Sequence, residues 1–319
     1  MTMKKILCLL GVLFMFSSSN LIAQKNTISG YIEDAKTGER MVGVNLVAKE
    51  VLLGTTTNTY GFYSMTLPVS SYTLEFSFIG YETFSISVDL SEDAHYNVSL
   101  KTQTLELQEI VLTGEENIVK RTQSSVIDVP VEQIKSMPSL LGEVDVLKAI
   151  QLLPGVQSGS EGSSGFYVRG GGPDQNLILL DGVPVYNASH LFGFFSVFNA
   201  DAIKNVRLTK GGFPARFGGR LSSVLEIDMK EGNTKAFEGE GSIGLIASKL
   251  TMQGPIVKDK ASWIVSARRN YIDALAQPFI MASSDGDRGG YYFYDLNAKV
   301  NYKISDKDRL YLSLIHISE

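Results

Sequence analysis

The side chains best suited to catalysis or metal binding are few and widely spaced in this chain of 319 residues. Before the last few residues, the only two histidines are His95 and His190, which lie too far apart in sequence to form a metal-ligand motif. The glycine clusters contain neither a Gly-x-x-x-x-Gly-Lys-Ser/Thr loop nor a Gly-x-Ser-x-Gly turn. Gly170-Gly171-Gly172 lacks the third glycine of a dinucleotide-binding loop. The sequence therefore predicts no enzyme, no cofactor and no metal site.

The first 23 residues have the pattern of a secretory signal peptide. Lys4 and Lys5 precede an apolar run over residues 6–16, and small residues follow up to a cleavage site predicted after Ala23. The apolar run is too short for a membrane helix, which needs about twenty apolar residues. Cys8, the only cysteine, lies within it, so the mature chain has no thiol. The formal net charge of −5 and the lack of a Lys/Arg cluster argue against nucleic-acid binding.

Residues 24–103 show short alternating runs separated by turn residues, a pattern typical of a β-sandwich. Their order resembles the carboxypeptidase-regulatory-like (transthyretin-like) family. The matching segments are residues 29–30, 34–39, 61–63 and 80–82. The family name implies no peptidase here, because His95 is the only histidine in the region.

The linker, residues 104–118, contains an aliphatic and β-branched segment that favours an extended strand. One interpretation makes it the last strand of the sandwich. It also resembles a TonB box, the strand by which a periplasmic partner grips a receptor through backbone hydrogen bonds. The predicted TonB box consists of Leu107, Gln108, Glu109, Ile110, Val111, Leu112 and Thr113.

Residues 119–235 read as a mixed α/β domain. Apolar residues at spacings of three predict a helix over residues 143–153, and Pro154-Gly155 ends it. Asp181-Gly182 lies between two apolar runs, which is a strong hairpin signal.

Four segments of this domain resemble the plug of TonB-dependent outer-membrane receptors. They are residues 152–156, 168–170, 180–184 and 211–220, in the family's order and with its spacing. The resemblance implies a plug enclosed by a transmembrane β-barrel. Because barrel interiors are polar, we expect Arg169, Arg216 and Arg220 to form ion pairs with the barrel wall.

The segment 190–198 contains four phenylalanines in nine residues. Two interpretations carry equal weight, namely a buried part of the plug core and a ligand-facing apical loop. The residues that would face a ligand are His190, Phe192, Phe194 and Phe195.

From residue 236 onward, apolar and polar residues alternate with a period of two, which predicts the first strands of a transmembrane barrel. The pattern is clearest over residues 292–304. Short turns are predicted near Ala247 and over residues 257–260 and 305–308, with a long connection over residues 272–290. The predicted fold class is thus a β-dominated multidomain protein with a signal peptide, a small transthyretin-like β-sandwich, an α/β plug and the first strands of a barrel.

The predicted strands after the plug number about five, whereas single-chain bacterial barrels need at least eight. The alternation also gives way over residues 315–319. We therefore expect the chain to be an N-terminal fragment of a longer receptor.

The resemblance implies a receptor that imports a scarce solute across the outer membrane, with the sandwich in the periplasm. It implies three partners: a TonB-type energy-transducing protein, outer-membrane lipid and an extracellular solute. A surface lipoprotein is a further candidate partner. The alternative is a surface ligand-sensing or assembly protein on the same scaffold without net import.

Overall fold

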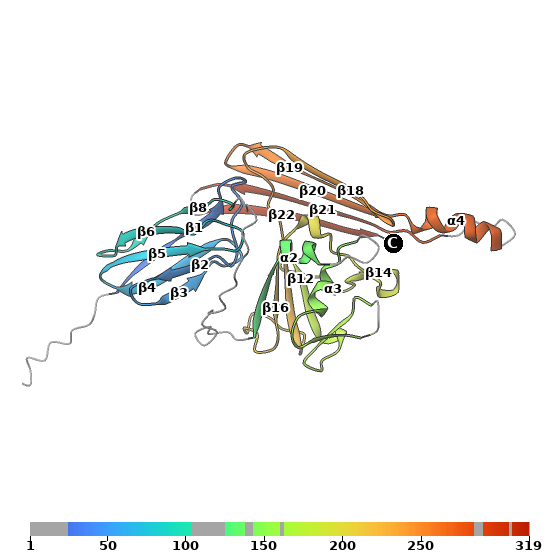
Figure 1. The fold of residues 1–319 in the computed structure, drawn as a ribbon, viewed down its shortest axis with the longest axis horizontal. Helices are drawn as coiled ribbons and strands as arrows, with labels where there is room; N and C mark the ends of the chain where they lie inside the picture. The colour runs from blue at the N-terminus through green and yellow to red at the C-terminus, as the bar shows by residue number, and fades with distance from the viewer. Residues whose placement is uncertain are drawn as a thin grey trace, which may run out of the picture.

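The computed structural model describes residues 25–103, 125–137, 143–159, 163–283, 290–305 and 308–318. The predicted signal peptide and the predicted TonB box lie outside these residues. Figure 1 shows a blue sandwich on one side, a green and yellow α/β domain beside it, and a long orange and red sheet that runs over both. The described helices include none that is long and apolar enough to cross a membrane.

The N-terminal domain is a sandwich of two sheets. One has the order β4-β1-β7, with β8 also paired to β1, and the other has the order β3-β2-β5-β6. Alternate residues of β1 and β4 point inward, so a shared apolar core forms between the sheets. The strands are β1 (Lys25–Asp34), β2 (Asn45–Ala48), β3 (Leu53–Thr56), β4 (Phe62–Pro68), β5 (Ser71–Ser77), β6 (Phe84–Asp89), β7 (Ala94–His95) and β8 (Val98–Leu100).

The central domain, hereafter the plug, is built on a five-stranded sheet of order β13-β12-β17-β16-β9. Only β12 and β17 run parallel, and two small hairpins, β10-β11 and β14-β15, flank the sheet. Its elements are β9 (Val126–Pro130), α2 (Val131–Ser136), α3 (Val146–Gln151), β10 (Val156–Ser158), β11 (Phe166–Val168), η2 (Pro173–Gln175), β12 (Asn176–Leu180), β13 (Val183–Pro184), β14 (Ser189–His190), η3 (Leu191–Gly193), β15 (Phe195–Ser196), η4 (Ala200–Ala202), β16 (Ile203–Thr209) and β17 (Ser223–Met229).

Two local predictions for the plug are confirmed. Helix α3 lies inside the predicted range, and it begins at Val146 because the Asp145 side chain accepts hydrogen bonds from the N–H groups of Leu147 and Lys148. The hairpin β12-β13 turns at Asp181-Gly182, whose φ angles of 48° and 80° are those that a two-residue hairpin turn requires.

The C-terminal sheet is an antiparallel meander of order β18-β19-β20-β21-β22, hereafter the long sheet. The turns predicted near Ala247 and over residues 257–260 join its first three strands. Its elements are β18 (Glu238–Ile243), β19 (Ala247–Val257), β20 (Ala261–Asn270), α4 (Ile272–Ser283), β21 (Tyr294–Lys303) and β22 (Arg309–Ser318).

Two features of the long sheet were not predicted from the sequence. The connection over residues 272–290 contains the helix α4, which has proline inside it and extends away from the sheet (Figure 1). Strand β22 does not lose its structure after Leu314 but pairs with β21 as far as Ser318. The polarity pattern changes there because the inward-facing Ile315 packs against the apolar core of the plug.

Candidate functional site

The long sheet buries its polar face and exposes its apolar face. On β21, the buried side chains are Asp295, Asn297, Lys299 and Asn301, whereas Tyr294, Val300 and Tyr302 alternate with them and are exposed. Leu312 on β22 is 69% exposed. A sheet in water has the opposite arrangement, because burial of charge is costly and burial of apolar area is favourable. The apolar face therefore fits an apolar surrounding, and the polar face is the one that holds the plug.

Arg268 on β20 is the centre of the largest polar contact between the plug and the long sheet. Its Nη1 donates to Oε1 of Glu143 at 3.0 Å, and its Nε donates to Oδ2 of Asp295 at 2.9 Å. A third bond joins its Nη2 to the carbonyl oxygen of Ser196 at 2.7 Å. Glu143 and Ser196 belong to the plug, so one guanidinium binds two plug segments and the neighbouring strand.

Two further side chains complete this group, hereafter the Arg268 cluster. Nε2 of His190 lies 2.7 Å from Oδ1 of Asp295, and its ring stacks on Phe293 with a centroid distance of 4.0 Å. Nζ of Lys249 on β19 lies 3.1 Å from Oε1 of Glu143. The cluster consists of Glu143, His190, Lys249, Arg268 and Asp295.

Burial decides the energetic role of the Arg268 cluster. The side chains of Arg268 and Asp295 are each 1% exposed, and that of Glu143 is 5% exposed. Desolvation of buried ions offsets much of their attraction, so such a cluster adds little net stability. Removal of one member, however, leaves an uncompensated buried charge. The cluster therefore specifies how the plug is seated more than how stable it is.

A second contact lies nearer the middle of the sheet. Asp181, in the hairpin turn of the plug, forms an ion pair with Lys299 on β21 at 3.0 Å and accepts a hydrogen bond from Ser313 on β22. Its other carboxylate oxygen accepts from the N–H of Met229 at 2.8 Å. The same turn that makes the β12-β13 hairpin thus also binds the long sheet.

A third contact joins all three domains where the plug ends. Nζ of Lys204 on β16 lies 3.2 Å from Glu231 and 3.6 Å from Glu39 of the sandwich. Glu231 also forms an ion pair with Arg309 at the start of β22, at 3.1 Å. Burial raises the pKa of Glu39, against the opposing charge of Lys204. Burial acts in the same direction on Glu231, but Lys204, Arg309 and Lys299 outweigh it and lower its pKa.

The three arginines predicted to hold the plug in place lie elsewhere. Arg216 is 3.9 Å from Glu226 of the plug itself, and Nη2 of Arg169 lies 3.5 Å from Oγ of Ser125. Arg220 donates to the carbonyl oxygen of Gly219. Within the described part of the chain, none of these arginines forms an ion pair or hydrogen bond with strands β18–β22. Their pairing with a barrel wall stays a prediction.

The segment predicted to face either the core or a ligand is divided between the two. His190 and Phe195 are buried against the long sheet and against Phe293, which lies just before β21. Phe194 is 47% exposed, and the side chain of Phe192 lies outside what the structure describes. A ligand-facing role therefore stays a prediction, and within the described part Phe194 is the side chain most available for it.

The charged residues that seat the plug were not identified from sequence. Arg268, Asp295 and Lys299 occupy the polar positions of period-two strands, and that alternation is the signal that could have singled them out. Glu143 precedes a helix and Asp181 lies in a turn. The local sequence pattern therefore indicates only that these residues shape the helix start and the turn, and it gives no sign of a contact with the long sheet. In the described part of the chain, no group of three or more His, Cys, Asp or Glu residues is placed to hold a metal ion.

Comparison with protein families identifies two domains. Residues 28–112 match the CarboxypepD_reg-like domain, and residues 119–223 match the TonB-dependent Receptor Plug Domain. The first match extends through most of the predicted TonB box.

Individual relatives carry the same family name. The chain is 30% identical over 194 residues to TonB-dependent receptor P3 of Formosa agariphila. This alignment covers 57% of this chain and 19% of that protein. It is 28% identical over 234 residues to TonB-dependent receptor SusC of Bacteroides thetaiotaomicron. This alignment covers 68% of this chain and 22% of that protein. The chain thus spans about a fifth of the length of these curated relatives.

Among solved structures, the siderophore receptor PirA from Acinetobacter baumannii aligns with 60% of this chain and 31% of its own, at 20% identity and a TM-score of 0.44. The two domain matches and the named relatives agree with one another. The chain therefore contains a CarboxypepD_reg-like domain followed by a TonB-dependent receptor plug domain, and its named relatives are TonB-dependent receptors.

Proposed function

We propose that the receptor containing this chain imports a scarce solute across the outer membrane, with energy supplied by a TonB-type protein of the periplasm. The observation that carries the proposal is the reversed polarity of the long sheet. Its exposed face is apolar, as lipid requires, and its buried face binds a plug through charged side chains.

The lengths of the connections support one orientation of the chain in the membrane. The turn at residues 257–260 and the short connection between β21 and β22 lie beside the sandwich, whereas the opposite end of the sheet carries α4 as well as the short connection between β18 and β19 (Figure 1). Outer-membrane barrels have short periplasmic turns and long extracellular loops. This supports a periplasmic sandwich and an extracellular α4.

The coupling strand would be the segment Leu107–Thr113. It follows the sandwich and precedes β9 in the chain. The proposed domain plan is a sandwich to residue 103, a linker to 118, a plug to 235 and barrel strands from 236.

Transport can be tested before the solute is identified. Cells with the full-length receptor, cells without it and cells without the TonB-type partner are grown in one rich medium, and the spent media are compared by mass spectrometry. We expect at least one compound to be depleted only when receptor and partner are both present. If binding at the cell surface occurs but no compound is depleted, the receptor is a ligand sensor or an assembly protein.

A further inference from the structure

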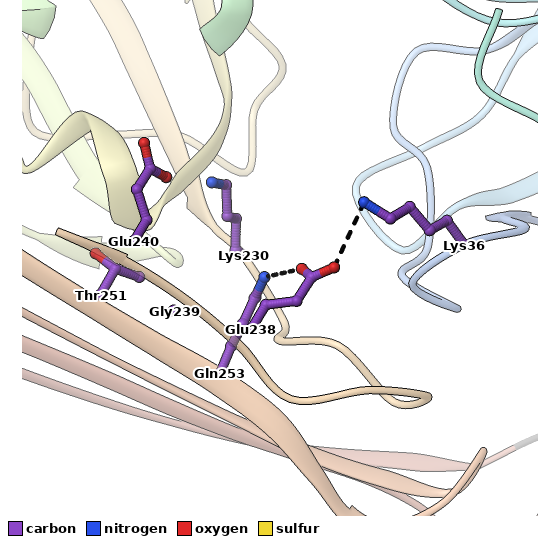
Figure 2. Close-up of a pocket in the computed structure, with 7 residues that line it drawn as sticks. All are labelled: Lys36, Lys230, Glu238, Gly239, Glu240, Thr251 and Gln253. Carbon is purple, nitrogen blue, oxygen red and sulfur yellow. Dashed lines mark hydrogen bonds and ion pairs between the residues drawn. The ribbon is translucent and has the colours of Figure 1, made fainter. Parts of the chain in front are cut away.

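A polar cavity of about 400 Å³ lies where the sandwich, the end of the plug and the first barrel strands meet (Figure 2). Its side chains come from all three parts of the chain and are two lysines, two glutamates, a threonine and a glutamine: Lys36, Lys230, Glu238, Glu240, Thr251 and Gln253.

This lining selects for hydrophilic solutes. Both signs of charge are present, together with hydroxyl and amide groups, and the described lining has no aliphatic or aromatic side chain. An apolar solute would have to strip water from these groups without replacing their hydrogen bonds, which is costly. A solute that carries charge or many hydroxyl groups can replace its hydrogen bonds to water with hydrogen bonds to the lining side chains.

A loop of the sandwich, residues 34–39, closes one side of the cavity. Nζ of Lys36 lies 3.5 Å from Oε1 of Glu238 on β18, and Figure 2 shows the two side chains pointing toward one another. The carbonyl oxygen of Thr37 accepts hydrogen bonds from both N–H and Oγ1 of Thr234, each at 2.9 Å. Nζ of Lys235 donates to the carbonyl oxygen of Ala35 at 2.6 Å.

The loop has its own internal support, so its shape does not depend on the contact itself. Oδ1 of Asp34 accepts hydrogen bonds from the N–H groups of Lys36 and Thr37, at 2.6 and 2.9 Å. Oδ2 of Asp34 accepts from the hydroxyl of Tyr81 at 2.6 Å. The shape of the tip is therefore supported by contacts within the sandwich.

Gly38 makes the close approach possible. Its φ of 73° is in the left-handed region, and a Cβ at this position would lie 2.3 Å from Oγ1 of Thr234. A side chain here would force either the loop or the Thr234 hydroxyl, which donates to the Thr37 carbonyl, to shift, and either movement weakens the contact.

We propose that residues 34–39 are a latch over the periplasmic end of a hydrophilic passage, and that polar solute leaves between the plug and β18-β19 when the latch opens. The inference rests on the proposed transport function. It gives the sandwich a role in release of solute, and it restricts the solute to hydrophilic compounds.

The latch can be tested by cysteine accessibility in the full-length receptor in detergent micelles. Lys230 lines the cavity, so Lys230→Cys as the sole reactive cysteine reports whether the passage is open. The probe is trimethylammonium-ethyl methanethiosulfonate, a small permanent cation. We expect Gly38→Ala to raise the labelling rate by about tenfold, because overpacking a tight contact shifts an equilibrium by roughly this factor.

The chain offers a matched control. Gly80 has a φ of 83° but nothing within 4 Å of a Cβ, so Gly80→Ala carries the same backbone strain without a clash and leaves the rate unchanged. Thr234→Ala removes the clashing Oγ1 together with its hydrogen bond to Thr37, but the Thr234 N–H bond to Thr37 remains and the Cβ lies at an ordinary 3.6 Å. Gly38→Ala/Thr234→Ala is therefore expected to label more slowly than Gly38→Ala. If Gly38→Ala does not fold, Lys235→Ala weakens the latch instead and is expected to raise the rate.

Equal labelling rates in the Gly38→Ala and Gly80→Ala receptors, with no increase in Lys235→Ala, would overturn the latch. The apolar probe benzyl methanethiosulfonate tests the hydrophilic passage. If opening the latch raises its labelling rate as much as that of the cation, the passage is not hydrophilic. Because labelling needs neither uptake nor the TonB-type partner, its failure is distinct from failure of the depletion experiment that tests transport.

Discussion

Nη1 of Arg268 and Oε1 of Glu143 lie 3.0 Å apart, although 125 residues separate them in sequence. Glu143 stands just before helix α3, whose N-terminus is capped by Asp145, and Asp145 also accepts a hydrogen bond from the N–H of Ser196. The Arg268 guanidinium binds the Ser196 carbonyl as well. Two separate plug segments therefore reach one guanidinium, and they do so only when the plug is correctly seated.

We predict that Arg268→Ala destabilises the seated plug by about 3–5 kcal/mol, because Glu143 and Asp295 remain buried without their main partner. The measurement is denaturant unfolding of the full-length receptor. The control is Arg269→Ala, one residue along β20. Arg269 points outward, is 61% exposed and pairs with Asp273 at 3.7 Å, so its loss is expected to cost at most about 1 kcal/mol. Equal losses in the two variants would refute a seating role for Arg268.

Sequence predicted the strands of the long sheet well because period-two alternation is a local signal. The face pattern of β21, with Tyr294 and Tyr302 on one side and Asp295 and Lys299 on the other, is present in the order of residues alone. The turn at Asp181-Gly182 was predictable for the same reason, since few residue pairs adopt its two positive φ angles.

The seating contacts could not be predicted because their partners are far apart in sequence. Arginines beside glycines, such as Arg169 and Arg220, looked like better candidates than Arg268, which was one polar residue in an alternating strand. Only the docking of the plug determines which strand positions meet a carboxylate. Helix α4 was missed because Pro278 lies inside it and proline usually breaks a helix.

The predicted TonB box can be tested by a single proline. Ile110→Pro removes a backbone donor and is expected to weaken pairing of this segment with the periplasmic domain of a TonB-type protein. Partner-dependent depletion of a compound should fall in cells, whereas ligand binding at the cell surface persists. Asn117→Pro lies in the same linker outside the box and serves as control. Normal transport by Ile110→Pro would contradict the assignment and favour a last sandwich strand.

Asp228 on β17 gives the plug a dependence on pH. Burial raises its pKa from 3.8 to about 6, the Asp181 carboxylate adds to the rise and Lys204 opposes it. Between these two pH values the folded state binds more protons than the unfolded state, so this contribution to stability is present at low pH and is lost as pH rises through about 6.

We therefore expect Asp228→Asn to stabilise the receptor at pH 8 and to have little effect at pH 4.5. The gain should be about 1–2 kcal/mol, less than the full shift implies, because the side chain is only partly buried and solvent screens it. Thermal unfolding at the two pH values measures it, with the exposed Asp174→Asn as control. A gain at pH 4.5 as large as that at pH 8 would contradict the assignment.

The sandwich is expected to fold without the rest of the chain. Its two sheets enclose their own apolar core, and Phe76 at the centre of that core is fully buried against Tyr63 and Phe84. Residues 24–103 expressed alone should therefore give a β-type circular-dichroism spectrum and one cooperative thermal transition.

Phe76→Ala is expected to cost the isolated domain about 3–5 kcal/mol, because it leaves a large cavity in a small core. Tyr60→Ala is the matched aromatic control. Tyr60 is 58% exposed and lies beside Tyr311 of β22, at a centroid distance of 6.0 Å, so its loss should matter little to the isolated domain. A disordered spectrum, or no thermal transition, would show instead that the sandwich needs the plug and the long sheet to fold. In that case the latch loop could not keep its shape when detached from the plug, and the sandwich would be a permanently docked part of the receptor.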